Sequence, residues 1–140
     1  MKNLLLISTL LFTVMFSSTS FSGLTVGDEN NDNNWTKVGK NREETIFYVD
    51  FLGIRKTDEN VYWWDLRDFL KPMINATMSG KLYNQGDCKL NRYKVLSDSF
   101  YKKPMGRGEI LSGSNVPDKE WRYPSLNSMN EVILKTVCSR

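Results

Sequence analysis

The segment that decides the fold is residues 126–138, which read LNSMNEVILKTVC. Ser128 and Glu131 form a capping box, in which the serine oxygen and the glutamate carboxylate satisfy free N–H groups at a helix start. On a helical wheel one broad arc holds Leu126, Met129, Ile133, Leu134, Val137 and Cys138. The opposite side holds Ser128, Glu131, Lys135 and Ser139. We therefore expect one amphipathic helix of about three turns at the end of the chain.

The chain before this helix has the composition of β-strands. Residues 45–51 are rich in β-branched and aromatic types, and both faces of this stretch are fairly apolar, so we expect a strand that is central or covered on both sides. Residues 54–57 and 61–66 predict a hairpin around the turn residues Asp58-Glu-Asn60. Further strands are expected at 35–38, 78–83, 88–101 and 109–111, with a loop at 68–76 and a turn at 84–87.

The N-terminus carries the three parts of a secretory signal peptide. Lys2 supplies a positive charge, residues 4–16 are almost all apolar, and Ser20-Phe21-Ser22 supplies small residues before a cut. The apolar run of about 13 residues is shorter than the roughly 20 that span a bilayer, so we interpret it as a leader rather than a membrane anchor. We expect residues 1–22 to be the signal peptide and 23–34 a flexible lead. No cysteine lies near the predicted cut, so no lipid-anchor motif is seen.

Export determines how the two cysteines are interpreted. In a small exported domain two cysteines usually pair, so Cys88 and Cys138 are expected to form a disulfide. The alternative is a pair of reactive thiols, but the two lie about 50 positions apart and in no C-x-x-C motif. The disulfide would pin the end of the predicted helix to the strand expected to begin at residue 88.

The 140-residue chain contains no histidine, which removes most catalytic options. Without imidazole there is no Ser-His-Asp triad, no Cys-His dyad and no His-ligated zinc site, and two cysteines are too few for a Cys-rich zinc site. Carboxylate catalysis remains, but a glycosidase needs two carboxylates about 5–9.5 Å apart across a cleft. The pairs Asp65 with Asp68 and Glu43 with Glu44 each lie within one short segment, which seldom gives that geometry. We therefore expect no enzyme activity, no cofactor and no metal.

Charge is distributed unevenly along a chain whose formal net charge is only +3. So small an excess predicts no nucleic-acid partner. Residues 89–107 nevertheless carry a local net charge of +5, with Asp98 as the one acidic residue. Two interpretations stay open for this stretch: a binding face for an acidic partner, or a solvated strand surface that resists aggregation. The candidate contact residues are Lys89, Arg92, Lys94, Lys102, Lys103 and Arg107.

Adjacent tryptophans provide a second candidate surface. Trp63 and Trp64 must point to opposite faces if they lie in a strand. One is expected in the core, and the other either covers the second face or forms a binding platform. Five other aromatic residues are expected to be core or packing residues: Tyr48, Phe51, Phe69, Phe100 and Trp121.

An ordered series of short motifs runs through the chain. It comprises Trp35, FYVD at 47–50, VYWWDLRD at 61–68, DC at 87–88, YKVL at 93–96, FY at 100–101, GRG at 106–108, Trp121, Pro124, Ser128 and Val137-Cys138. This series resembles the bacterial surface-adhesin protein E family over about residues 35–139. The resemblance implies an α+β fold for residues 35–140. In that fold an antiparallel sheet of about six strands carries one C-terminal helix on its concave face, pinned by the disulfide.

The resemblance also implies a function, because characterised members of that family are adhesins. It predicts a secreted or surface-exposed domain that binds host extracellular-matrix or plasma glycoproteins, or acidic glycans, through an exposed face. One alternative is a periplasmic or envelope domain with a structural role and no host ligand, self-associating as a weak homodimer through a sheet edge. Another is a small-molecule carrier, which would need a cavity beneath the helix. The expected location is the periplasm, the outer-membrane surface or the medium.

Overall fold

The structure of the protein is a computed structural model that describes residues 34–140. Two predicted segments lie outside the described residues. They are the signal peptide, residues 1–22, and the flexible lead, residues 23–34, of which only Asn34 is described. Within the described part no helix is long and apolar enough to cross a membrane.

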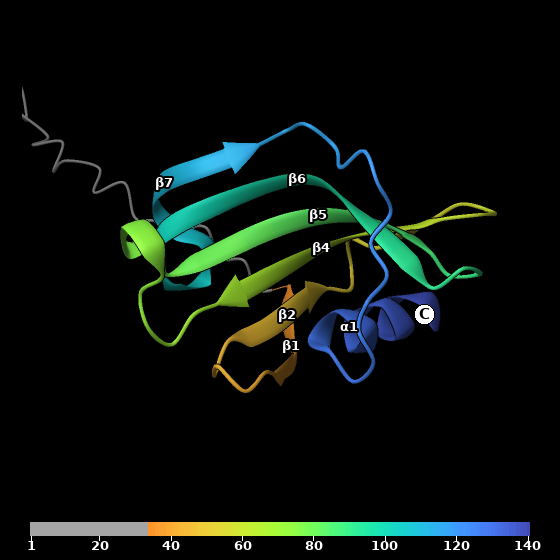
Figure 1. The fold of residues 1–140 in the computed structure, drawn as a ribbon, viewed down its shortest axis with the longest axis horizontal. Helices are drawn as coiled ribbons and strands as arrows, with labels where there is room; N and C mark the ends of the chain where they lie inside the picture. Colours follow the sequence, from red (N-terminus) through yellow and green to blue (C-terminus); the bar gives the residue numbers. More distant parts are fainter. Residues whose placement is uncertain (1–33) are drawn as a thin grey trace, which may run out of the picture. The chain divides into compact units, whose positions relative to one another are not determined.

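Seven strands form one antiparallel sheet in the described residues (Figure 1). They are β1 (Trp35–Lys40), β2 (Ile46–Asp50), β3 (Arg55–Lys56), β4 (Val61–Asp68), β5 (Ser79–Asp87), β6 (Arg92–Lys103) and β7 (Arg107–Ser114). The strand order is β1-β2-β4-β5-β6-β7, and β3 pairs with β4. Two 3-10 turns, η1 (Ile74–Ala76) and η2 (Pro104–Gly106), lie between strands, and the helix α1 (Met129–Cys138) follows the sheet. The predicted α+β fold class and the central place of the strand at 45–51 are confirmed.

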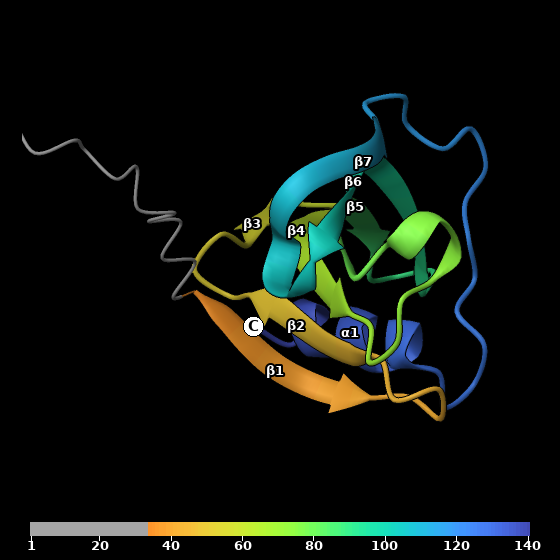
Figure 2. The same cartoon turned by 90° about the vertical axis from the view of Figure 1, so that its left-hand side faces the viewer.

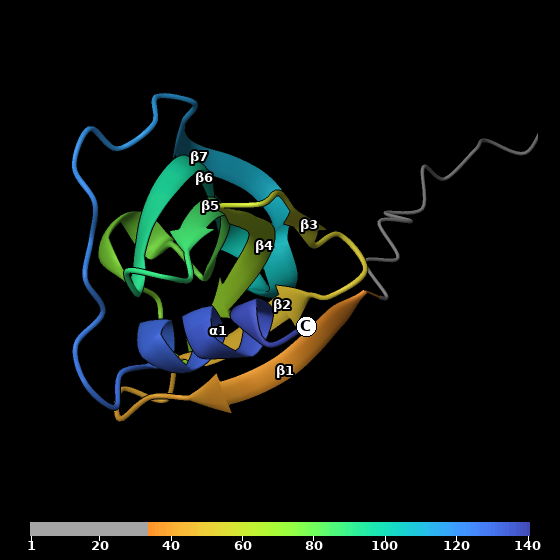
Figure 3. The same ribbon diagram turned by 90° about the vertical axis from the view of Figure 1, so that its right-hand side faces the viewer.

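Helix α1 lies in the hollow of the curved sheet (Figures 2 and 3). The core joins three side chains of α1 to four strands: Phe47, Val49, Val61, Trp63, Leu82, Tyr93, Val95, Ile133, Leu134 and Val137. Side chains of β2, β4, β5 and β6 join those of the helix in one cluster because the sheet curves around α1. The strand β7 lies at the edge of the sheet farther from α1 in both views.

The interface between α1 and strand β5 is filled. Gly86 in β5 faces the helix, and a Cβ placed there would lie 2.7 Å from Leu134 Cδ1 and 2.9 Å from the Trp63 ring. Such close contact leaves no space for a ligand between the helix and this strand. The packing therefore counts against a carrier cavity between α1 and β5.

The turn predicted at residues 84–87 is wrong. Strand β5 continues through these residues to Asp87, and the chain turns at 88–91 before β6. The sequence Asn-Gln-Gly-Asp is typical of turns, but the Asn84 amide is buried and Gly86 fits beneath the helix. The real turn is stabilised by Asp87, whose Oδ1 accepts a hydrogen bond from the Leu90 amide at 3.0 Å. Tertiary contacts thus override the local turn preference.

The predicted helix start is confirmed, with two differences. Ser128 is the N-cap, and its Oγ accepts a hydrogen bond from the Glu131 amide at 3.2 Å. Glu131, expected on the solvent side, is only 6 % exposed, because its Oε2 accepts from the Asn127 amide at 2.6 Å and its Oε1 from Lys135 Nζ at 2.6 Å. Leu126, expected on the apolar arc, lies outside the helix and is 84 % exposed. Asn127 adopts a positive φ of 60°, so the chain changes direction between Leu126 and α1.

Glu131 makes the helix start sensitive to acid. The hydrogen bonds from Lys135 and from the Asn127 amide hold the pKa of Glu131 below its ordinary value of 4.5. A carboxylate with a lowered folded pKa stabilises the fold fully above the unfolded value and loses that contribution as the pH falls through the folded value. We expect Glu131→Gln to lower the melting temperature at neutral pH, and this difference from wild type to shrink below pH 4.5. Thermal melts across the acid range check this, and a gap that is independent of pH would contradict it.

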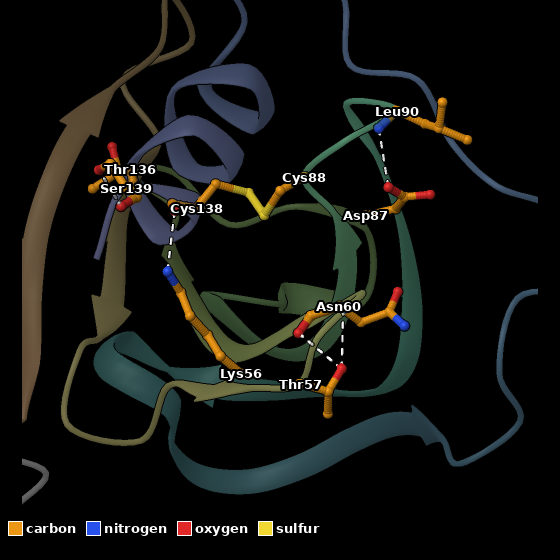
Figure 4. The surroundings of a disulfide bond; sticks show 9 residues. All are labelled: Lys56, Thr57, Asn60, Asp87, Cys88, Leu90, Thr136, Cys138 and Ser139. Atoms are coloured by element: carbon orange, nitrogen blue, oxygen red, sulfur yellow. Dashed lines mark hydrogen bonds between the residues drawn. A yellow bond between two sulfur atoms is a disulfide. The ribbon is translucent and has the colours of Figure 1, made fainter.

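The predicted disulfide between Cys88 and Cys138 is confirmed (Figure 4). The Cα atoms lie 5.7 Å apart, and Cys88 belongs to the turn after β5 rather than to a strand that begins there. Beside the bond, Lys56 Nζ donates a hydrogen bond to the Cys138 carbonyl at 3.1 Å, which joins the end of α1 to β3. The C-terminus of the helix is therefore held to two different parts of the sheet.

The 3-10 turn η2 covers one end of the sheet face opposite α1. There Ser79 Oγ donates to the Lys103 carbonyl at 2.6 Å and accepts from the Gly106 amide at 2.8 Å. Asp68 Oδ1 accepts from the Met105 amide at 2.8 Å, so η2 is fastened over this end. The same face carries the more exposed Trp64 farther along β4, and we call this uncovered part the open face.

Candidate functional site

The six candidate cations divide between the two ends of β6. This strand has 12 residues and spans about 37 Å at the usual rise of an antiparallel strand. One group lies where β6 begins: Lys89, Arg92 and Lys94. The other lies where β6 meets β7 across η2: Lys102, Lys103 and Arg107. The basic stretch of the sequence is therefore two separate basic surfaces in the fold.

The first group surrounds an aromatic ring. The Arg92 guanidinium lies 4.5 Å from the centroid of the Trp121 ring, and Lys94 Nζ lies 5.0 Å from it. Residues two apart in a strand share a face, so both cations contact the ring from one side of β6. Cations over an indole face are attracted by its electron-rich π system. We call Lys89, Arg92, Lys94 and Trp121 the Trp121 cluster.

A second strand-like segment positions Trp121. The Tyr93 amide donates to the Arg122 carbonyl at 2.9 Å, and the Arg122 amide donates to the Tyr93 carbonyl at 2.8 Å. This antiparallel bridge covers the edge of β6 at its beginning, where β7 does not pair. Trp121 was expected as a packing residue before the helix, and the bridge makes it a half-buried partner of the cations instead.

A carboxylate and a backbone carbonyl accept hydrogen bonds from the cations of this surface. Arg92 Nε donates to Asp87 Oδ2 at 3.0 Å, and Lys94 Nζ donates to the Lys119 carbonyl at 2.9 Å. The hydrogen bond from the Leu90 amide, with help from Arg92, lowers the pKa of Asp87. Partial burial opposes ionisation of Asp118, but hydrogen bonds from Arg122 and the Val95 amide outweigh it and lower the pKa of that carboxyl. Both acids therefore stay charged at neutral pH, and the cluster has a defined geometry.

An open hollow adjoins the Trp121 cluster. Its volume is about 580 Å³, and the β3–β4 turn and the β5–β6 turn face each other across it. Asp58 and Glu59 contribute acidic groups to one wall, whereas Lys89, Arg92 and Trp121 belong to the other. Leu90, half-exposed, also lines the hollow, and Tyr123 nearby along the chain is 67 % exposed. The surface thus offers cations, anions and apolar area together, as protein-binding surfaces do.

The second group of cations is held differently. Lys102 Nζ lies 3.6 Å from Glu109 Oε2, and Arg107 Nε donates to the Pro104 carbonyl at 3.3 Å. The stem of Lys103 lies against Gly108, where a Cβ would come within 2.9 Å of it. Surface ion pairs of this kind contribute little energy individually. We regard this end as the weaker candidate for binding.

The two candidate carboxylates of β4, Asp65 and Asp68, lie on opposite faces of the sheet and do not face each other across a cleft. Asp65 is buried on the helix side, where Arg67 Nε donates to it at 3.2 Å and Asn84 Nδ2 at 2.8 Å. Burial raises the pKa of Asp65, more than Arg67 and Asn84 lower it. Asp68 lies three residues later on the opposite face, bound to the Met105 amide. Asp65 therefore belongs to a structural network with Arg67 and Asn84, neither of which was among the predicted site residues.

The structure shows how deeply each of the predicted core aromatic side chains is buried. Trp63 is the core member of its pair, 2 % exposed, and Trp64 is 36 % exposed on the open face. Phe51 packs against the core cluster from outside. The other three rings expected in the core are half-buried: Tyr48, Phe69 and Phe100.

The domain is a small sheet closed by a helix and a disulfide, with charged and aromatic side chains presented outside. The family model for surface-adhesin protein E matches residues 35–139, and the chain belongs to that family. The predicted family is thus confirmed. The family consists of surface adhesins, which indicates a binding protein rather than an enzyme, and one that is exported or exposed at a surface.

Solved structures agree with this assignment. A crystal structure of Haemophilus influenzae protein E, crystal form II, has 14% identity and a TM-score of 0.58, covering 76% of this chain and 87% of that one. Protein E from non-typeable Haemophilus influenzae has 14% identity and a TM-score of 0.52, covering 76% of each chain. At this level of identity the likeness shows a shared fold. No match is found among curated protein sequences.

Proposed function

We propose that this protein is an exported adhesin whose Trp121 cluster contacts a host extracellular-matrix or plasma glycoprotein. The observation that carries the proposal is the family match across residues 35–139, which covers nearly all of the described domain. Because fold alone does not determine function, the position of the contact surface has to come from the residues themselves.

The chemistry of the Trp121 cluster suits an acidic partner. Arg92 presents a planar guanidinium that pairs with carboxylate or sulfate groups, and Lys94 adds a second charge across the Trp121 ring. Tryptophan and arginine are the residue types that most often dominate binding energy at interfaces. The surrounding fixed charges would orient the partner and increase its rate of association.

A salt series tests the proposal with purified, oxidised protein. We expect saturable binding to laminin, vitronectin or heparan sulfate that weakens as salt rises, because screening shortens the range of charge attraction to about 10 Å at 0.1 M. Binding that reaches saturation and falls with salt would support the adhesin. No saturable binding at any ionic strength would exclude it.

One observation favours a second candidate, the self-associating envelope domain. Strand β7 is one edge of the sheet, and its Ile110 is largely exposed. An exposed edge strand is a template for pairing with another chain. Fractionation of cells that make the protein separates the two functions, because recovery in the periplasm alone would favour the envelope domain over the adhesin.

A further inference from the structure

Three aromatic rings lie together on the open face, apart from the core. Trp64 in β4 is directly opposite Tyr83 in β5, with ring centroids 4.9 Å apart. Tyr62, two residues before Trp64 and on the same face, stacks against Tyr83 with centroids 6.4 Å apart. We call Tyr62, Trp64 and Tyr83 the aromatic plate. None of these three rings belongs to the core cluster between the sheet and α1.

Polar groups stand at the rim of the aromatic plate. A hollow of about 400 Å³ is lined by Trp64, Tyr83, Asp50, Gly53 and Arg55. Asp50 Oδ1 accepts from the Leu52 amide at 3.1 Å and from the Gly53 amide at 3.0 Å, so the carboxylate is held in position. Gly53 allows this approach, since a Cβ there would lie 2.6 Å from Asp50 Oδ2. The β2–β3 turn therefore presents a fixed acceptor beside an aromatic ring.

Arg55 supplies the complementary donor. It lies in β3 opposite Tyr62 in the register with β4, and thus at the same rim as Asp50. A guanidinium has five N–H donors and a carboxylate has only acceptors, so the two groups together serve a ligand that both donates and accepts. Their opposite charges balance, which favours a neutral ligand over an acidic or a basic one.

We propose that the aromatic plate binds a neutral pyranose ring of a glycan chain. A pyranose has an apolar face of C–H groups, which matches an indole plane, and a rim of hydroxyls that donate to Asp50 and accept from Arg55. Binding sites for small ligands combine an apolar surface with a few placed polar groups in this way.

The pyranose site is separate from the Trp121 cluster but lies on the same face. Tyr62 is opposite Gln85, and Gln85 is opposite Lys94, so one row across β4, β5 and β6 joins the two surfaces. Neighbouring strands are about 4.8 Å apart, so the sites adjoin without sharing a residue. Sugar binding would depend on the aromatic plate and its polar rim, so its test is independent of the charge-dependent binding proposed above.

Titration with three neutral sugars tests the pyranose site. Chitotriose, lactose and cellotriose would be added to the full, oxidised protein up to millimolar concentration, with tryptophan fluorescence and saturation-transfer NMR as readouts. We expect saturable binding of at least one sugar that changes little with salt. Trp64→Ala should weaken it at least about tenfold, whereas Trp64→Phe should keep part of it because a ring remains.

The matched variants make the result decisive. Tyr123→Ala removes an exposed ring outside the plate and should leave sugar binding unchanged. Arg55→Ala changes an exposed residue of a two-residue strand, so it should weaken binding without unfolding, and it replaces Trp64→Ala if that variant does not fold. Saturable binding by none of the three sugars would overturn the inference. Equal binding by wild type, Trp64→Ala and Arg55→Ala would overturn it as well.

Discussion

Loss of the disulfide should lower the free energy of unfolding by about 4 kcal/mol, which follows from the entropy of closing a loop of its length. Cys88 and Cys138 are separated by 50 positions, so the bond closes nearly half of the described domain into one loop. The free energy of unfolding of a small domain is about 5–15 kcal/mol, so the loss is a large fraction of the total. We expect the double variant Cys88→Ser/Cys138→Ser to be close to its stability limit at body temperature.

Denaturant unfolding of wild type and of the double serine variant measures this difference. Hydrogen exchange adds a local readout. Amides at the C-terminal end of α1 should lose the most protection, because the disulfide holds this end of the helix. The Lys56 hydrogen bond to the Cys138 carbonyl remains nearby but is a weaker link. Wild type treated with reductant serves as a control, because reduction breaks the disulfide bond and leaves the sequence unchanged. Equal unfolding midpoints for oxidised and reduced protein would contradict the structural role of the disulfide.

The second large effect is expected at Asp65. Asp65→Ala leaves Arg67 and Asn84 without their carboxylate, and removing one partner of a buried pair costs about 3–5 kcal/mol. We expect about 3 kcal/mol, the lower end, because the Arg67 side chain retains 23% of its surface in water. Arg67 also lies over the Phe47 ring and donates to Asn130, so its displacement would disturb the start of α1.

Asp65→Asn is the matched control. It keeps the size of the side chain and part of its hydrogen bonding, and burial already disfavours the charged form, as the raised pKa of Asp65 shows. We therefore expect a loss of only about 1 kcal/mol, comparable to one hydrogen bond. Denaturant unfolding of both variants checks the order. A loss for Asp65→Asn as large as that for Asp65→Ala would mean that the ionic charge, rather than the filled network, stabilises this site.

Local interactions account for what could be predicted about the helix. The cap at Ser128, the apolar spacing and the Cys138 end all act within one segment, so they are visible in the sequence. The burial of Glu131 depends on a hydrogen bond from Asn127, which sits in a left-handed conformation that the wheel does not represent. The strands were likewise identified by their residue types, whereas their ends depended on partners elsewhere in the chain.

Long-range pairing accounts for what could not be predicted. Asn84 and Gly86 are residue types that favour turns, and only the contacts with Asp65, Trp63 and Leu134 explain why they lie in β5. The charge of the 89–107 stretch was evident, but its division into two surfaces follows from the length of β6. The pairing of Trp121 with the cations depends on the bridge between Arg122 and Tyr93 of β6, which joins segments far apart in the sequence.

The proposed adhesin is tested most directly by comparing two charge-reversal variants with wild type. Arg92→Glu/Lys94→Glu changes the Trp121 cluster, and Lys102→Glu/Lys103→Glu makes the same change in net charge at the other end of β6. Binding of each purified, oxidised protein to laminin, vitronectin and heparan sulfate would be measured at one ionic strength. The account predicts that the first variant binds at least about tenfold more weakly, whereas the second stays near wild type. Equal binding by all three proteins, or a loss confined to the second variant, would contradict it.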